Sequence, residues 1–149
     1  IPLKEDDALP GIVLPNGKDI PDRLIARYGP NLENMCLAVT TPGSVSLDGM
    51  AVTRGGGPDQ IESALNQILV GVMDLADSVS LHVGEQHLLI DVAKPKLKYD
   101  NIWYYRCLGS PLASVVATVA SQALAQAVRI KSETETGKNN TRIELEILP

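Results

Sequence analysis

The chain has 149 residues, of which 44% are hydrophobic, and a formal net charge of −5. This length predicts one domain with a sizeable core, and the negative charge argues against nucleic acid or an anionic membrane surface as a partner. Cys36 and Cys107 lie far apart in the sequence. This spacing favours free thiols in a reducing compartment, so we expect a cytoplasmic protein, with a single disulfide as the alternative.

The N-terminal part is rich in turn signals. Residues 1–30 contain five of the ten prolines and are predicted to form a Pro-rich arm of a single domain that spans residues 1–149. Within the arm, residues 19–28 favour a short helix that ends at Gly29-Pro30. Residues 35–40 and 44–53 are predicted to be two strands around the turn Thr41-Pro42-Gly43.

A glycine-rich stretch precedes the first long helix. That helix is predicted over residues 58–77 by an apolar stripe, which comprises Ile61, Leu65, Ile68, Leu69, Val72 and Leu75. Glycines let backbone amides turn towards a ligand, a helix N-terminus favours an anion, and arginine binds phosphate or carboxylate groups. Arg54, Gly55, Gly56 and Gly57 are therefore candidate ligand-binding residues, and a solvated connector is the alternative.

Two histidines flank a predicted turn. Residues 79–83 and 87–92 have the pattern of a hairpin around Gly84-Glu85-Gln86. His82 and His87, with Asp91 or Glu85, form a candidate metal site. Their spacing matches no metal-binding motif, so we favour two surface histidines and predict no metal.

An aromatic segment leads into the centre of the chain. Residues 102–108 are predicted to form a strand on which Trp103, Tyr105 and Cys107 share one face. Tyrosine and tryptophan suit positions that are partly wet, such as a pocket or an interface. We therefore assign these three residues and Ser110 to the candidate ligand-binding site. Ordinary sheet packing with an inert thiol is the alternative.

The central feature is an uncharged run over residues 110–128. Ser110 followed by Pro111 is typical of a helix start, and apolar side chains occupy every side of the helix predicted over 110–128. The run is too short and too polar for a membrane span. We expect a fully buried helix, with a sheet on one side and a homodimer partner on its outer face.

Residues 128–134 and 141–148 are predicted to form a last hairpin. In its second strand Ile143, Leu145 and Ile147 face one way, and the charged residues between them face the other. Together the elements predict the α+β class, with a largely antiparallel β-sheet and two main helices.

The order of features from residue 61 to 148 also carries a resemblance. Cys107 and Gly109 stand at the start of the long apolar helix, Glu133 lies in the strand after it, and Gly137 precedes the final strand. This order resembles the 4-vinyl-reductase-type domain, a small-ligand module related to Bet3-like subunits of the transport protein particle. Thr136 and Thr141 stand near the places where that family usually has further cysteines, so its thiol or metal-linked chemistry is not expected here. A roadblock or longin-type scaffold is similar in its helix–hairpin–helix order but does not account for the last hairpin.

The resemblance implies an apolar or ring-shaped small ligand held between the central helix and the sheet. We therefore expect a non-enzymatic small-molecule-binding or regulatory module, with no particular cofactor indicated. One alternative is an enzyme that holds a small anionic substrate at the Arg54 loop and uses Cys107 or a histidine for acid–base chemistry. The other is a structural or scaffolding subunit of a complex.

Overall fold

The computed structural model describes residues 25–27, 35–37, 41–43, 52–97, 105, 109–137 and 139–148. The chain divides into two compact units, one of residues 1–40 with Pro149 and one of residues 41–148. In the first unit, β1 (Ile25–Arg27) pairs antiparallel with β2 (Met35–Leu37). The helix predicted over residues 19–28 is therefore wrong at Ile25–Arg27. Pairing with β2 supplies hydrogen bonds to this segment, whereas so short an isolated helix is marginal in water.

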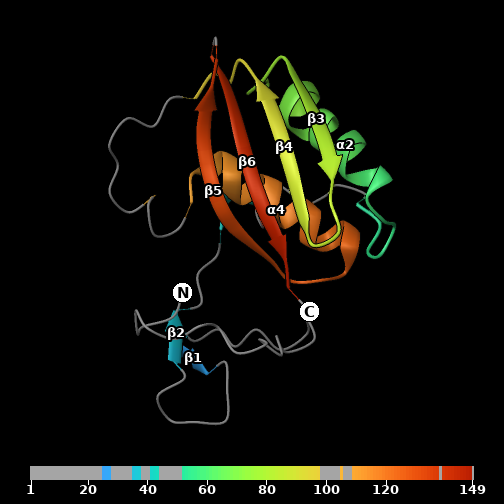
Figure 1. Cartoon of the computed structure of the whole chain (residues 1–149), viewed down its shortest axis with the longest axis vertical. Helices are drawn as coiled ribbons and strands as arrows, with labels where there is room; N and C mark the ends of the chain where they lie inside the picture. The colour runs from blue at the N-terminus through green and yellow to red at the C-terminus, as the bar shows by residue number, and fades with distance from the viewer. Residues whose placement is uncertain are drawn as a thin grey trace. The chain divides into compact units, whose positions relative to one another are not determined.

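The second unit is built on a four-stranded antiparallel sheet in the order β3-β4-β6-β5 (Figure 1). Its strands are β3 (Ser78–Val83), β4 (His87–Ala93), β5 (Val128–Thr136) and β6 (Asn140–Ile147). Both predicted hairpins are confirmed, and they join through the pairing of β4 with β6, where Ile90 lies opposite Ile143. Strands β3 and β5 are consequently the two edges of the sheet.

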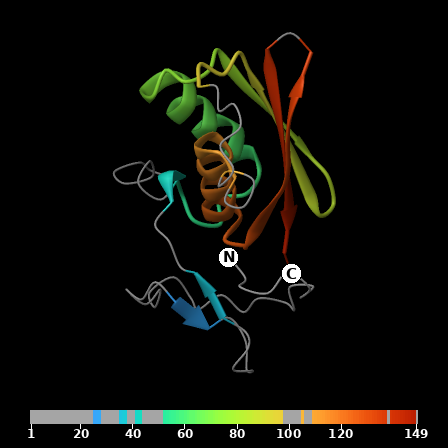
Figure 2. The same cartoon turned by 90° about the vertical axis from the view of Figure 1, so that its left-hand side faces the viewer.

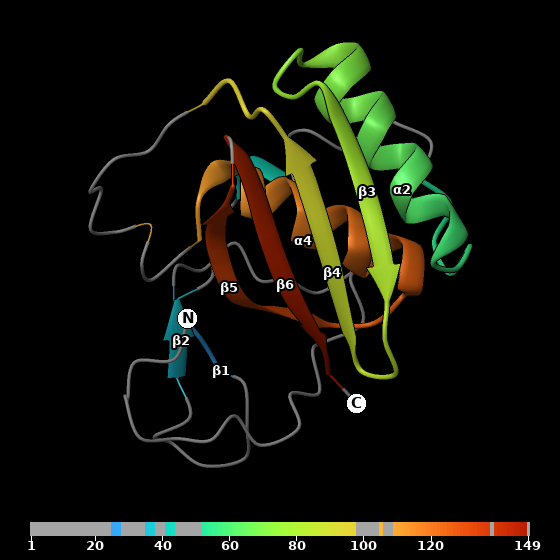
Figure 3. The ribbon, with the colours of Figure 1, turned by 45° about the horizontal axis from the view of Figure 1, so that its top comes forward.

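Two helical segments cover one face of this sheet (Figure 2). Helix α2 (Asp59–Leu65) continues directly into the π-helix η1 (Asn66–Val72), and α4 (Pro111–Leu124) is the second segment. Figure 3 shows α2 running beside the edge strand β3. The two segments and the inner face of the sheet share one hydrophobic cluster. The predicted α+β class is thus confirmed.

The first helical segment is shorter than predicted. It ends at Val72 rather than at residue 77, and Asp74 follows it with a left-handed φ of 51°. Met73 N–H donates to the carbonyl of Ile68, five residues back. Such wide turns rotate successive side chains less than an α-helix does. Val72 therefore leaves the predicted buried stripe and is 62% exposed.

The central helix begins as predicted and ends early. Ser110 caps it, but α4 stops at Leu124, Ala125 adopts a left-handed φ of 54°, and Val128 already belongs to β5. No glycine or proline follows Leu124, so the uncharged run gives no sequence signal for the turn between α4 and β5. The helix is also not covered on every side, because Gln122 is exposed.

Much of two predicted segments falls on residues that are not described. Of the strand predicted over residues 102–108, the structure describes only Tyr105, which is helical and half-buried. Trp103 and Cys107 lie outside the described residues, as does most of the strand predicted over 44–53. Among the helices that the structure describes, none has both the length and the apolar character needed to cross a membrane.

Candidate functional site

The glycine loop predicted to bind a ligand closes the C-terminal end of α4. Gly55 N–H donates to the carbonyl of Gln122 (3.2 Å), and Gly57 N–H donates to that of Ala123 (3.0 Å). Both glycines have positive φ angles, 74° and 91°, which side chains rarely tolerate. These amides thus satisfy the carbonyls that a helix end leaves without partners, and they do not face a ligand. Gly56 N–H donates within the loop, to the carbonyl of Thr53, and Arg54 beside it is exposed.

Ser110 lies at the opposite end of α4. Its Oγ accepts a hydrogen bond from Ala113 N–H (3.0 Å) and donates one to Oε1 of Glu133 (2.7 Å). The Ser110 N–H donates to the other carboxylate oxygen at 3.4 Å. The carboxylate of Glu133 therefore occupies the position where a helix N-terminus would attract an anion.

The structure consequently does not bring Arg54 and Ser110 together. They lie near opposite ends of a 14-residue helix, which corresponds to about 21 Å of helix length. The described residues thus do not bring these two predicted site residues into one pocket, and ligand binding by the predicted set stays a prediction. The Arg54 loop and Ser110 instead hold the two ends of α4 in place.

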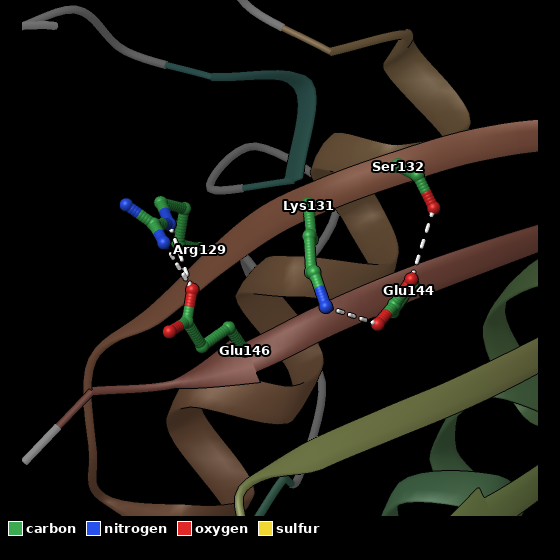
Figure 4. Close-up of polar contacts among 5 residues, drawn as sticks. All are labelled: Arg129, Lys131, Ser132, Glu144 and Glu146. Atoms are coloured by element: carbon green, nitrogen blue, oxygen red, sulfur yellow. Dashed lines mark hydrogen bonds and ion pairs between the residues drawn. The ribbon is translucent and has the colours of Figure 1, made fainter.

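A β-bulge in β5 explains how Glu133 reaches the helix. The register with β6 shifts between Ile130 and Ser132, so that Lys131 and Ser132 both approach Glu144 on the open face (Figure 4). Lys131 Nζ lies 2.8 Å from Glu144 Oε1, and Ser132 Oγ lies 3.3 Å from Oε2. Beyond the bulge, Glu133 lies opposite the buried Ile143 and so faces the helices. The hydrogen bond from Lys131 lowers the pKa of the Glu144 carboxyl.

The two histidines have different neighbours. His82 Nε2 lies 3.7 Å from Asp91 Oδ2, and Arg142 binds both oxygens of Asp91 at 2.7 and 2.8 Å. The ring of His87 instead packs against the turn, where a Cβ on Gly84 would lie 2.6 Å from its Nε2. In the ranges that the structure describes, no three histidine, cysteine or acidic side chains gather as metal ligands.

A groove that the sequence did not predict lies between α2 and β3. It has a volume of about 410 Å³, and its lining comprises Pro58, Asp59, Glu62, Ser63, Asn66, Leu81 and Val83. Ligand-binding clefts typically measure about 300–1,000 Å³. The groove is therefore large enough to hold a small ligand or a short stretch of peptide.

The helix seals one half of the β3 edge along this groove. The Asn66 side chain donates to the carbonyl of Val79 (2.8 Å) and accepts from its N–H (3.0 Å), as a neighbouring strand would do. Oε2 of Glu62 accepts from Leu81 N–H (2.8 Å). The backbone groups that an edge strand normally exposes are thus covered as far as Leu81 N–H.

The other half of the edge is open. In an antiparallel pair, alternate residues turn their backbone groups away from the partner strand. Val79 and Leu81 turn theirs towards α2, so Val83 turns its N–H and carbonyl the same way. The Leu81 carbonyl and the Val83 N–H thus point away from β4. Within the described part of the chain, no group on the α2 side of the strand forms a hydrogen bond with either of them. The Val83 side chain is 56% exposed.

Glu62 and Asn66 are not among the residues of the predicted apolar stripe, and no sequence pattern pairs them with β3. Their spacing of four residues puts them on one side of the helix, which is the only sequence signal for this arrangement.

Comparisons of the chain with protein-family models, curated proteins and solved structures found no match. The resemblance to the 4-vinyl-reductase-type domain thus stays a prediction.

Proposed function

We propose that this chain is a non-enzymatic binding module with a regulatory or scaffolding role, and that its ligand occupies the groove between α2 and β3. The observation that carries the proposal is the combination of backbone groups without partners and two exposed carboxylates, Asp59 and Glu62, along one groove. Such a surface recognises a ligand through hydrogen bonds and charge.

We place the ligand in this groove rather than in the pocket that we expected between the central helix and the sheet. Val116, Val119 and Ala120 of α4 are 0% exposed and pack in the same cluster as Leu88 and Ile90 of β4. These side chains fill the space between helix and sheet. The α2–β3 groove, in contrast, opens to solvent.

The proposal is tested by two-dimensional ¹H–¹⁵N spectroscopy of the full chain. The probes are short peptides of basic, acidic and neutral composition, small amines and small carboxylates. We expect at least one class to shift the amide signals of Glu62, Leu81 and Val83 in a saturable way. If every class leaves these signals in place, or shifts only signals elsewhere, the groove is not the binding site.

We further propose a homodimer and a cytoplasmic location. Half-buried small side chains on α4, such as Ala117 and Ser121, support a partner on this helix, and the widely separated cysteines support a reducing compartment. Size-exclusion chromatography with light scattering tests the dimer. A mass of one chain at all concentrations would contradict it.

A further inference from the structure

We propose that the groove binds an extended, basic segment of a partner protein, which adds to β3 as a further strand at Leu81–Val83. This inference rests on the proposed function, because it names the ligand class of the same groove. It draws on three observations: the open backbone groups, the charge of the rim, and the half of the edge that is already covered.

The backbone groups define the geometry of binding. A residue of an incoming strand placed opposite Leu81–Val83 donates its N–H to the Leu81 carbonyl and accepts from the Val83 N–H. Strand addition of this kind uses main-chain hydrogen bonds for affinity and alternate side chains for specificity. The exposed Val83 side chain and Pro58 supply apolar contacts for such side chains.

The rim selects the charge of the segment. Asp59 and Glu62 are both exposed and line the groove, and Glu62 uses only Oε2 to hold Leu81, which leaves Oε1 for a ligand. The chain as a whole carries a net charge of −5. Lysine or arginine side chains on the incoming strand are therefore attracted, and acidic ones are repelled.

The covered half of the edge limits the length of the segment and disfavours a second copy of this chain. Symmetric pairing of two β3 strands needs outward groups along the whole strand, but Asn66 already binds both backbone groups of Val79. Only the end of β3 accepts a partner. Two copies would also bring acidic rims together.

The test compares two blocked hexapeptides of alternating residues, lysine with valine and glutamate with valine. Titration of the full chain is followed through the amides of Leu81 and Val83. We expect the lysine peptide to bind and the glutamate peptide to shift neither signal. A lysine peptide that is N-methylated on the residue whose N–H donates to the Leu81 carbonyl should bind about tenfold more weakly, because it lacks this main-chain donor.

Two variants separate the backbone from the charge. Val83→Pro removes the outward N–H at an edge position that tolerates proline, and it should weaken the lysine peptide about tenfold, while Val83→Ala keeps the N–H and most of the affinity. Asp59→Asn should weaken binding about two- to fivefold, and Glu135→Gln on the distant strand β5 should leave it unchanged.

The outcomes distinguish the two proposals. If the groove amides respond to the glutamate peptide or to a small molecule but not to the lysine peptide, the groove binds a ligand and the inference of a basic strand is wrong. If the N-methylated peptide binds as well as its parent, strand addition is wrong. If only signals outside the groove shift, both proposals fail.

Discussion

Asn66 joins a helix to a strand through both ends of one side-chain amide. Its Nδ2 also donates to the carbonyl of Glu62 at 3.0 Å, so this residue makes three hydrogen bonds to backbone groups. Val79, which it holds, is only 4% exposed. The backbone groups of Val79 therefore have little access to water that could replace the amide when it is removed.

We expect Asn66→Ala to lower the free energy of unfolding by about 2–3 kcal/mol, because it leaves the buried Val79 backbone groups without partners. Urea denaturation followed by circular dichroism measures the change. Gln67→Ala, at the exposed neighbouring position, is the matched control and should stay within about 0.5 kcal/mol. Equal effects of the two substitutions would show that Asn66 does not hold the edge strand.

Asp91 and Arg142 make stability depend on pH. The hydrogen bond from Arg142 lowers the pKa of the Asp91 carboxyl below its ordinary value of 3.8. The unfolded chain therefore takes up this proton first as the pH falls. The stabilisation is fully present above pH 3.8 and is lost as the pH falls through the lower pKa of the folded state.

We expect Asp91→Asn to make the free energy of unfolding depend less steeply on pH below pH 3.8. Chemical denaturation of the wild type and the variant between pH 2 and 7 tests the expectation. Arg142→Gln should weaken this pH dependence in the same way, and the double substitution should add little, because the two groups act as a pair. The expectation is wrong if Asp91→Asn retains the wild-type slope below pH 3.8.

At the scale of elements, α4 is fixed at both ends by segments distant in the sequence. The glycine loop holds its C-terminal end, and Ser110 with Glu133 holds its N-terminal end. A third segment approaches its side, where Gly43 N–H donates to Ser114 Oγ at 3.3 Å. The small side chains of α4 permit these close approaches.

We expect Ser110→Ala to lower the free energy of unfolding by about 1 kcal/mol, since it removes the capping hydrogen bond from Ala113 N–H. Glu133→Ala should also lower it by about 1 kcal/mol, since it removes the carboxylate that accepts from the Ser110 hydroxyl and N–H. In the double variant the loss should be smaller than the sum of the two, which a double-mutant cycle by urea denaturation measures. Glu135→Ala, an exposed position on the same strand, serves as the control. Strictly additive losses would mean that the two side chains do not interact.

Gly43 and Gly71 should respond to alanine in opposite directions. A Cβ on Gly43 would clash with the Ser114 carbonyl and with Thr118 Oγ1, so Gly43→Ala should destabilise the fold by about 1–3 kcal/mol. The nearest atom to a Cβ on Gly71, in η1, is 3.9 Å away, so Gly71→Ala should stabilise it by up to about 1 kcal/mol. Thermal unfolding of both variants tests this contrast. A stabilising Gly43→Ala would contradict the packing of residue 43 against α4.

At the scale of the whole molecule, the second unit contains the hydrophobic core. Among the residues whose burial the structure describes, every member of the core cluster lies between Val52 and Ile147. We therefore expect the fragment 41–149 to fold without residues 1–40 and to unfold cooperatively. Its ¹H–¹⁵N spectrum should overlay that of the full chain for the sheet residues, whereas a collapsed, poorly dispersed spectrum would show that the first unit is required.

The class and the two hairpins could be predicted because they depend on local patterns. The alternation at Ile143, Leu145 and Ile147 buries one face of β6 as expected, since neighbouring side chains on a strand point to opposite faces. The end of α4 could not be predicted in the same way. No local stop signal follows Leu124, and the bonds that close the helix come from the glycine loop, more than sixty residues earlier.

The candidate site was harder to predict because it depends on contacts between residues of different helices and strands. The glycine loop and Ser110, both predicted to bind a ligand, proved to hold the two ends of one helix, and the groove at β3 was not predicted. Sequence alone determined the α+β class, the hairpins and the inward faces, because side-chain periodicity is a property of each segment by itself. Only the tertiary structure decided that β3 is an edge, that Asn66 covers half of it, and that a bulge turns Glu133 towards Ser110. Asn66 and Val79 are 13 positions apart in the sequence, and Ser110 and Glu133 are 23 positions apart. Only folding brings each pair within hydrogen-bond distance.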